Sequence, residues 1–285
     1  MLFHDFPDKL IDRVPKNPFI RKAYVMPTCQ CLLVDTHAHL CAADFDADRE
    51  AVLQRAREAG VGAVIAVGED LADAHRNVRL AKTHSMLKPA AGLYPTILDL
   101  AQADAMETFI REQRFHLAAI GEVGLDFWVV KDEPQRALQQ EIFERFIDLS
   151  IELNLPLNVH SRSAGRHVVS LLLRHQALRV QLHAFDGKAG AALPAVEAGY
   201  FFSIPPSVVR SRQKQKLVRQ LPLSAILVET DSPVLGAVPN QRNEPANLCL
   251  AVTAIAQIKS IPVLDVVAAV VENTQRLYGE DIQDG

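Results

Sequence analysis

The feature that most constrains the fold of this chain is a regular alternation of short apolar runs with longer segments of helical periodicity. Beyond residue 31, eight runs rich in β-branched and other apolar residues are separated by amphipathic stretches. Strands joined by helical crossovers of this length pair in parallel through right-handed connections. The predicted strands are Leu32–Thr36, Gly62–Val67, Lys88–Leu93, Ala118–Val123, Leu157–His160, Val180–His183, Tyr200–Ser203 and Ala225–Glu229.

The number of these units favours a closed barrel. Eight βα units within 285 residues fit a TIM (β/α)8 barrel better than an open doubly wound sheet. The first strand is not followed by the G-x-G-x-x-G motif that is typical of dinucleotide-binding open sheets. The segment from Glu244 onward is also helical in pattern, and we expect it to pack outside the barrel. The predicted fold class is therefore α/β, with chemistry at the carboxyl ends of the strands.

The first 30 residues differ in composition from the rest of the chain. They mix proline with acids and bases and contain no apolar core of the kind found in a secretory signal. Asp5, Asp8 and Asp12 also argue against a mitochondrial transit peptide. We therefore predict an N-terminal arm over residues 1–30 and a barrel domain over residues 31–285.

Charge and cysteine content bear on partners and compartment. A net charge of -4 and a pI near 6.2 argue against a protein that coats nucleic acid by bulk charge. They do not exclude a nucleic-acid enzyme in which metals handle the phosphate. No apolar run reaches the roughly 18 residues that span a membrane. The four cysteines are scattered, which suits a reducing compartment, so we expect an intracellular protein of the cytoplasm or nucleus with no membrane partner.

The first predicted strand ends in "VDTHAH", which contains two histidines separated by one residue. Side chains in a strand alternate between faces, so His37 and His39 should point the same way, about 7 Å apart, with Ala38 turned outward. Such a pair either shares a metal ion or closes a strand with polar groups. By itself the pair does not decide between these interpretations.

Four other predicted strands also end in residues that can bind a metal. Glu122 ends the fourth strand, with Asp126 just beyond it, and His160 and His183 end the fifth and sixth. The eighth strand ends in "ETDSP", which places Glu229 and Asp231 there. Each residue alone has a plain structural explanation, such as a surface acid, a core histidine or a turn residue. Because these explanations are independent of one another, their joint occurrence at one rim favours a metal site.

The composition of this set suggests two divalent ions. Four histidines and two carboxylates exceed the needs of one four-coordinate ion: His37, His39, Glu122, His160, His183 and Asp231. A carboxylate such as Glu122 can bridge two cations, and two cations about 3.5 to 4 Å apart suit hydrolysis. Asp231 is well placed both to bind metal and to accept the proton of an attacking water. Zn²⁺, Mn²⁺ and Mg²⁺ all remain compatible with such ligands.

Six motifs in this order resemble those of the TatD family of metal-dependent hydrolases: "VDTHAHL", "GEVGLDF", "NVHSRSAGR", "HAFDG", "ETDSP" and "RNEPANL". The resemblance covers roughly Leu32 to Tyr278. It implies a TIM-barrel phosphoesterase or deoxyribonuclease of the metal-dependent hydrolase type, with DNA or nucleotides as the substrate.

The resemblance also implies roles for individual residues. The first metal would be held by His37, His39 and Asp231, and Glu122 would bridge to a second metal held by His160 and His183. Asp231 would be the catalytic base, and Arg162 and Glu244 would lie near the substrate.

One motif departs from the family. The family carries Gly-x-His-Pro after its third strand, whereas this chain has Gly92-Leu93-Tyr94-Pro95. The residue lies beside the metals, so metal binding should survive. A neutral phenol cannot become cationic near pH 7 as imidazole can, so Tyr94 would weaken a phosphate contact or a proton transfer at the substrate site.

Two further segments of the sequence each have two possible interpretations. The basic segment "VRSRQKQKLVRQL" at residues 209–221 is either a phosphate contact or, as we favour, a solvated helix face. Phe127 and Trp128, just past Glu122, either stack on one nucleotide or pack under a loop.

Two functions compete with the phosphoesterase. An amidohydrolase on the same barrel would cleave C–N or ester bonds, but many of those enzymes have a carboxylated lysine where this chain has Glu122. The other alternative is a barrel without enzymatic activity that binds metals only for stability or for a partner. Its main support is Tyr94, which replaces the histidine of the family motif.

Overall fold

The computed structural model describes residues 33–283, and its centre is a single eight-stranded parallel sheet. The predicted arm over residues 1–30, and the boundary after it, lie outside the described residues. Neighbouring strands in the sheet are also neighbours in sequence, from β1 to β8. The strands are β1 (Leu33–Ala38), β2 (Val61–Ala66), β3 (Leu87–Ala91), β4 (Ala119–Gly124), β5 (Leu157–His160), β6 (Val180–Leu182), β7 (Phe201–Ile204) and β8 (Ile226–Val228).

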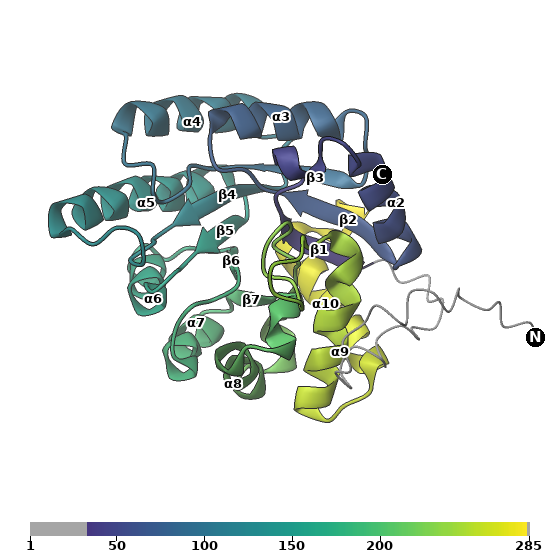
Figure 1. Ribbon diagram of the computed structural model, residues 1–285. Coiled ribbons are helices and arrows are strands. Elements are labelled where there is room, and N and C mark those ends of the chain that lie inside the picture. Colours follow the sequence, from purple (N-terminus) through teal and green to yellow (C-terminus); the bar gives the residue numbers. More distant parts are fainter. Residues whose placement is uncertain (1–32, 284–285) are drawn as a thin grey trace, which may run out of the picture.

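Helices surround these strands on the outside, as Figure 1 shows. The predicted TIM (β/α)8 barrel is thus confirmed, and all eight predicted strands are present with ends that differ by a few residues. The helices are α2 (Arg49–Glu58), α3 (Leu71–Ala81), α4 (Leu100–Gln113), α5 (Glu133–Leu153), α6 (Gly165–Arg174), α7 (Leu193–Glu197), α8 (Arg212–Gln220), α9 (Leu248–Lys259) and α10 (Val263–Tyr278). Short 3-10 turns occupy Ala43–Phe45, Ala189–Ala192, Pro206–Val209, Leu223–Ala225, Pro245–Asn247 and Glu280–Gln283.

Aspartates begin several of the helices. The side chain of Asp99 accepts hydrogen bonds from the amides of Ala101 and Gln102, and Asp132 caps α5 in the same way through Gln135. These bonds satisfy amides that have no partner within the helix. Local sequence therefore fixes where α4 and α5 begin, and with it the length of the loop before each of them.

The core has two layers, which follow the two-residue period of the strands. In β2, Ala63 and Ile65 belong to a cluster inside the barrel, whereas Val64 and Ala66 belong to the larger cluster that the helices cover. Ala38 joins the outer cluster, as expected from its place between two histidines.

Strands β8 and β1 form the seam of the barrel, where side chains supplement the backbone. The Thr36 hydroxyl donates to the carbonyl of Val228 at 2.9 Å. The Asp35 carboxylate accepts from the amide and the hydroxyl of Thr230 at 2.8 and 2.5 Å. The pairing of β1 with β2 is irregular between Asp35 and Ala38, so simple alternation does not hold there. The carboxylate of Asp35 consequently binds Thr230, just past the end of β8, and does not join the side chains of His37 and His39.

The C-terminal segment does more than cover the outside of the barrel. Ile282 packs with Val34, Ala63 and other residues of the inner cluster, and Tyr278 packs against the same cluster. The expectation that the tail packs only outside is therefore wrong for its end, because an aromatic and an aliphatic side chain close the amino-terminal mouth of the barrel.

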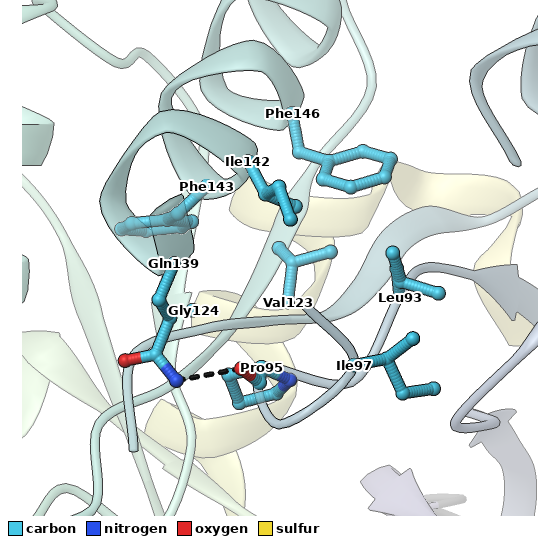
Figure 2. A pocket seen from close by; sticks show the side chains of 9 residues that line it. All are labelled: Leu93, Pro95, Ile97, Val123, Gly124, Gln139, Ile142, Phe143 and Phe146. Carbon is cyan, nitrogen blue, oxygen red and sulfur yellow. Dashed lines mark hydrogen bonds between the residues drawn. The ribbon is translucent and has the colours of Figure 1, made fainter. Parts of the chain in front are cut away.

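A narrow apolar crevice lies between α5 and the ends of β3 and β4 (Figure 2). The buried side chain of Gln139 at its edge links two loops: it donates to the carbonyl of Pro95 at 2.6 Å and accepts from the amide of Asp126 at 3.2 Å. The crevice is apolar packing behind the site, and Gln139 ties the Tyr94–Pro95 loop to the loop after β4.

No single helix within residues 33–283 is long and apolar enough to cross a membrane. One bent pair, Pro245–Lys259 with Val263–Tyr278, meets the length and composition criteria together, with an angle of 115° between its halves.

Candidate metal centre

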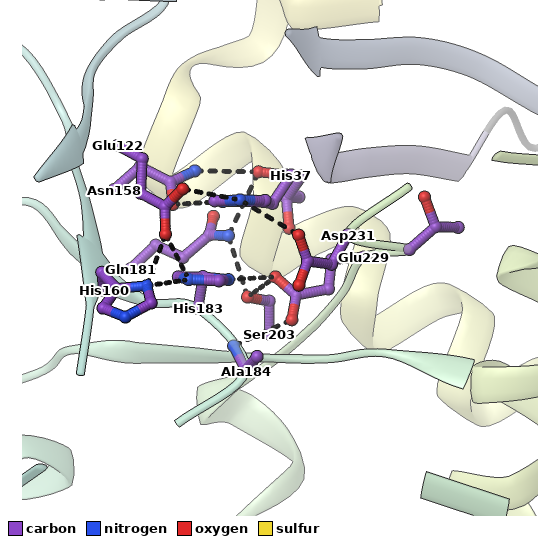
Figure 3. Close-up of polar contacts among 12 residues, drawn as sticks. His37, Glu122, Asn158, His160, Gln181, His183, Ala184, Ser203, Glu229 and Asp231 are labelled. Atoms are coloured by element: carbon purple, nitrogen blue, oxygen red, sulfur yellow. Dashed lines mark hydrogen bonds and ion pairs between the residues drawn. The ribbon is translucent and has the colours of Figure 1, made fainter. Parts of the chain in front are cut away.

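The carboxyl ends of five strands carry the six predicted ligands to one place. His37 lies near the end of β1 and His39 just past it, Glu122 lies within β4, and His160 is the last residue of β5. His183 directly follows β6, and Asp231 lies three residues past the end of β8. Figure 3 shows most of these side chains converging inside the barrel mouth.

Glu122 lies at the centre of this group, between two pairs of histidines. Its Oε2 is 3.4 Å from Nε2 of His39 and 3.7 Å from Nε2 of His37. Its Oε1 is 2.6 Å from Nδ1 of His160 and 2.9 Å from Nε2 of His183. One carboxylate thus presents a different oxygen to each pair.

Among the described residues, the ion-pair contacts of Asp231 are with the first pair. Its Oδ1 lies 3.6 Å from Nε2 of both His37 and His39, and those two nitrogens are 3.3 Å apart. Asp231 has a positive φ of 55°, in the left-handed region where aspartate is among the better tolerated residues. The backbone turn after β8 therefore directs its carboxylate back toward β1.

The electrostatics of the cluster are those of closely coupled buried groups. Burial raises the pKa of the Glu122 carboxyl, but His183 and His160 outweigh it and hold that pKa well below its usual range. Burial lowers the pKa of His183, yet Glu122 outweighs burial and the pKa lies well above the usual value. Burial and the neighbouring His183 instead lower the pKa of His37 well below its usual value. Burial raises the pKa of Asp231 to about 6.

The buried polar atoms of this cluster are arranged as metal ligands would be, and not all of them have a hydrogen-bond partner among the described residues. Glu122 Oε2 is buried and has no hydrogen-bond partner among the described residues. Ligand atoms of His37, His39 and Glu122 lie within 4.8 Å of one another, as do those of Glu122, His160 and His183. Imidazole nitrogens and carboxylate oxygens are the donors that Zn²⁺ and related divalent ions take in proteins. The residues present therefore fit divalent metal ions.

Polar side chains behind the histidines fix their orientation. Asn158 donates through Nδ2 to the carbonyl of Thr36 at 3.0 Å, so its Oδ1 is an acceptor. That oxygen lies 2.8 Å from Nδ1 of His37, which must then carry the proton. The Nε2 lone pair of His37 consequently faces the cluster. Partners of this kind hold the ring of a metal-binding histidine and select its tautomer.

His160 and His183 each have a carboxylate behind the ring in the same way, at longer distances. Asp126 Oδ2 lies 3.5 Å from Nε2 of His160, and Glu229 Oε2 lies 3.7 Å from Nδ1 of His183. His37 and His183 also stack, with ring centroids 3.8 Å apart and planes 7° apart.

A polar chain below the cluster reaches the end of α10. The Tyr278 hydroxyl donates to Oε1 of Gln181 at 2.6 Å, and Nε2 of Gln181 donates to the Ser203 hydroxyl at 2.9 Å. Ser203 in turn donates to Oε2 of Glu229 at 2.5 Å. These groups form the floor of the site, and most of them are visible in Figure 3.

Two glycines allow the neighbouring strands to approach closely. Gly124 has φ +146°, and a Cβ there would lie 2.1 Å from the carbonyl oxygen of His160. A Cβ at Gly92 would lie 2.6 Å from the carbonyl carbon of Gly121. The "GEVG" segment therefore brings Glu122 within reach of His160 only because these positions lack side chains.

The three predicted substrate contacts lie in different surroundings. The Tyr94 ring centroid is 5.2 Å from that of His160, and burial raises the pKa of Tyr94. Arg162 is exposed on the rim, with its guanidinium carbon 5.4 Å from the ring centroid of Trp128. Glu244 is not brought into the cluster: within the described part of the chain it pairs with Arg55, at 2.6 and 2.9 Å.

Sequence reasoning did not assign three residues that touch the histidines: Asp126, Asn158 and Glu229. Asp126 and Glu229 were visible as acids beside the fourth and eighth strand ends. Asn158 lies two residues before His160, so the strand period puts both on one face. Neither signal by itself distinguishes a supporting partner from a surface acid or a polar core residue.

A (β/α)8 barrel whose strand ends hold this set of imidazoles and carboxylates is typical of a metal-dependent hydrolase. The chain belongs to the TatD family: the family described as TatD related DNase matches residues 34–279.

Curated relatives span most of the chain. It is 43% identical over 258 residues to human "Deoxyribonuclease TATDN3", covering 86% of this chain and 94% of the relative. It is 31% identical over 257 residues to the metal-dependent hydrolase YabD of Bacillus subtilis, covering 87% and 99%. The crystal structure of the TatD homologue YjjV from Escherichia coli superposes with a TM-score of 0.81 at 28% identity, covering 88% of this chain and 99% of that chain.

Proposed function

We propose that this chain is a deoxyribonuclease that hydrolyses phosphoester bonds of DNA or nucleotides with two divalent metal ions. The observation that carries the proposal is the position of Glu122, whose two oxygens face two separate histidine pairs. A carboxylate in that position suits a bridge between two cations. The name of the human relative supports a DNA substrate for this chain.

The proposed ligand sets follow the two halves of the cluster. His37, His39 and Asp231 would hold one ion, His160 and His183 would hold the other, and Glu122 would bridge them. When bound, the ions would activate water and neutralise the negative charge of the phosphate. Zn²⁺, Mn²⁺ and Mg²⁺ are the candidates that these donors allow.

The protein groups around the ions have complementary tasks. Asp231 lies 3.6 Å from both histidines of the first pair, where its carboxylate would accept the proton of the attacking water. Arg162, which is exposed on the same rim, would contact a phosphate oxygen. Tyr94 is a neutral donor beside His160, where the family motif has an imidazole.

The barrel over residues 31–285 would be the catalytic domain and residues 1–30 an appended arm. A cytoplasmic or nuclear location would suit both the substrate and the free thiols of Cys41 and Cys249.

The decisive experiment is a substrate panel assayed with each metal. Metal-stripped protein is reloaded with Zn²⁺, Mn²⁺ or Mg²⁺ and given end-labelled oligonucleotides, a panel of amides and a panel of lactones. We expect cleavage of the oligonucleotides and none of the amides. Amide turnover without phosphoester cleavage would overturn the proposal in favour of an amidohydrolase, and no turnover with any metal would favour a structural role for the centre.

A further inference from the structure

The only tryptophan of the chain, Trp128, is exposed to solvent at the rim of the metal centre. Trp128 follows β4 and is 58% exposed, whereas its neighbour Phe127 is buried at 8%. The sequence left open whether these two aromatic residues stack on a nucleotide or pack under a loop, and the two residues differ in this respect. Phe127 packs under the loop, and Trp128 presents its ring to solvent.

The loop that carries this ring is tied to the metal centre. The amide of Trp128 donates to Oδ1 of Asp126 at 2.8 Å, and the other oxygen of Asp126 lies 3.5 Å from Nε2 of His160. The amide of Phe127 donates to the carbonyl of Arg162 at 2.9 Å, which joins the loops after β4 and β5. The exposed ring is therefore held at a defined position beside the centre.

Two cations flank the ring. Nζ of Lys131 lies 5.1 Å from the ring centroid of Trp128, and the guanidinium carbon of Arg162 lies 5.4 Å from it. Within residues 33–283 neither side chain forms an ion pair with a carboxylate. Exposed aromatic area and uncompensated positive charge therefore coincide at the edge of the site.

We propose that Trp128, flanked by Arg162 and Lys131, is a stacking platform for an unpaired nucleobase of the substrate. This inference rests on the proposed function and adds to it the substrate class: single-stranded DNA or an unpaired DNA end. Aromatic side chains bind bases of any sequence through their faces, and nearby cations follow the phosphate backbone. A base inside a duplex has both faces already stacked on its neighbours, so a duplex offers a free face only at its two ends, whereas every base of a single strand can offer one to Trp128.

The chain contains a matched control for this platform. Phe115 is 83% exposed and has the guanidinium carbon of Arg114 4.2 Å from its ring centroid. It follows the carboxyl end of α4, and barrel helices run antiparallel to the strands. Phe115 therefore lies at the opposite end of the barrel, with similar chemistry but no access to the metal centre.

The single tryptophan allows a test that does not need catalysis. Wild-type protein in EDTA is titrated with hexathymidylate, with an abasic oligonucleotide of equal length and with a blunt duplex, while tryptophan fluorescence is recorded. We expect saturable quenching with hexathymidylate and much weaker quenching with the abasic strand and the duplex. Equal quenching by the abasic strand, or none with hexathymidylate, would overturn the platform.

Variants provide the second arm, read by anisotropy of labelled hexathymidylate. Stacking of one base corresponds to a loss of about 5- to 150-fold in affinity for Trp128→Ala. Trp128→Phe should lose only a few-fold, and Phe115→Ala should bind like the wild type. An unchanged affinity of Trp128→Ala would overturn the platform. Oligonucleotide binding that depends on Trp128 without hydrolysis under any metal would instead leave the platform standing and contradict the proposed phosphoesterase.

Discussion

Asn158 and His37 are joined by a 2.8 Å hydrogen bond that determines which nitrogen of His37 faces the metal centre. The amide oxygen of Asn158 can only accept, so the proton of His37 is on Nδ1 and its Nε2 is free for a metal. This one contact connects the middle of β5 to the end of β1 and gives a buried candidate ligand a fixed orientation.

Replacing Asn158 with leucine should therefore weaken metal binding. Loss of a partner behind a ligating histidine typically costs 10- to 100-fold in metal affinity. Asn158→Asp keeps an acceptor oxygen and should retain affinity closer to the wild type. Isothermal titration with Mn²⁺ or Zn²⁺ measures both variants. Equal losses in the two variants would show that the amide acts through packing and not through the acceptor oxygen.

Removing the proposed base should abolish turnover without unfolding the barrel. Asp231→Asn is expected to lower kcat by about 10²- to 10⁴-fold, the usual contribution of a positioned general base. His160→Ala should also be inactive, through loss of a ligand. Oligonucleotide cleavage and circular dichroism are measured together, with Glu152→Gln, an exposed partner of Arg111, as the control. Unfolding of both variants, beside an inactive wild type, would support a purely structural metal centre.

Restoring the family imidazole at position 94 should change the pH profile. Burial raises the pKa of Tyr94, so its phenol stays neutral throughout the physiological range. Tyr94→His introduces a group that titrates around pH 6.5 and becomes cationic below it. We expect kcat/KM on oligonucleotides to rise relative to the wild type as the pH falls through that region. Tyr94→Phe should follow the wild-type profile, and a Tyr94→His profile parallel to it would contradict the argument.

Gly124→Ala should destabilise the barrel more than an alanine at another left-handed glycine. The new Cβ would collide with the carbonyl of His160, whereas at Gly199, φ +83°, a Cβ meets nothing within 4 Å. Gly199→Ala should lower the free energy of unfolding by the backbone cost alone, about 1–2 kcal/mol. Urea unfolding compares the two. A Gly124→Ala variant as stable as Gly199→Ala would mean that β5 shifts freely away from β4.

Low pH should break the ion pair between Asp48, which precedes α2, and Arg242 in the segment after β8. Hydrogen bonds from Arg242 first, and the nearby charge of Arg55, lower the pKa of Asp48. A carboxyl with a depressed folded pKa stabilises the protein above its unfolded pKa of about 3.9, and this stabilisation is lost as the pH falls further through the folded value. The Tm of Asp48→Asn should therefore vary less between pH 5 and 2.5 than that of the wild type. Asp44→Asn, which removes a neighbouring carboxylate without a charged side-chain partner in the described chain, should keep the wild-type slope.

Much of the fold was predictable because its signals are local. The alternation of apolar runs with segments of helical periodicity identified the eight βα units, and the barrel rule then placed His160 and His183 at one rim. The irregular pairing of β1 after Asp35 was not predictable, because it depends on the contact with Thr230 across the seam of the barrel. Asn158 shows the same limit: its role follows from a partner 121 residues away. The inward position of Tyr278 likewise depends on Gln181, 97 residues earlier.

The contact between Tyr278 and the floor of the site also sets an order of assembly during translation. Every proposed metal ligand precedes Tyr278 in the chain, and so do Gln181, Ser203 and Glu229 of the floor. A nascent chain that ends before α10 therefore carries all six ligands but lacks the hydroxyl that anchors Gln181 beneath them. The catalytic rim of this barrel is complete only after its opposite end has been synthesised and closed.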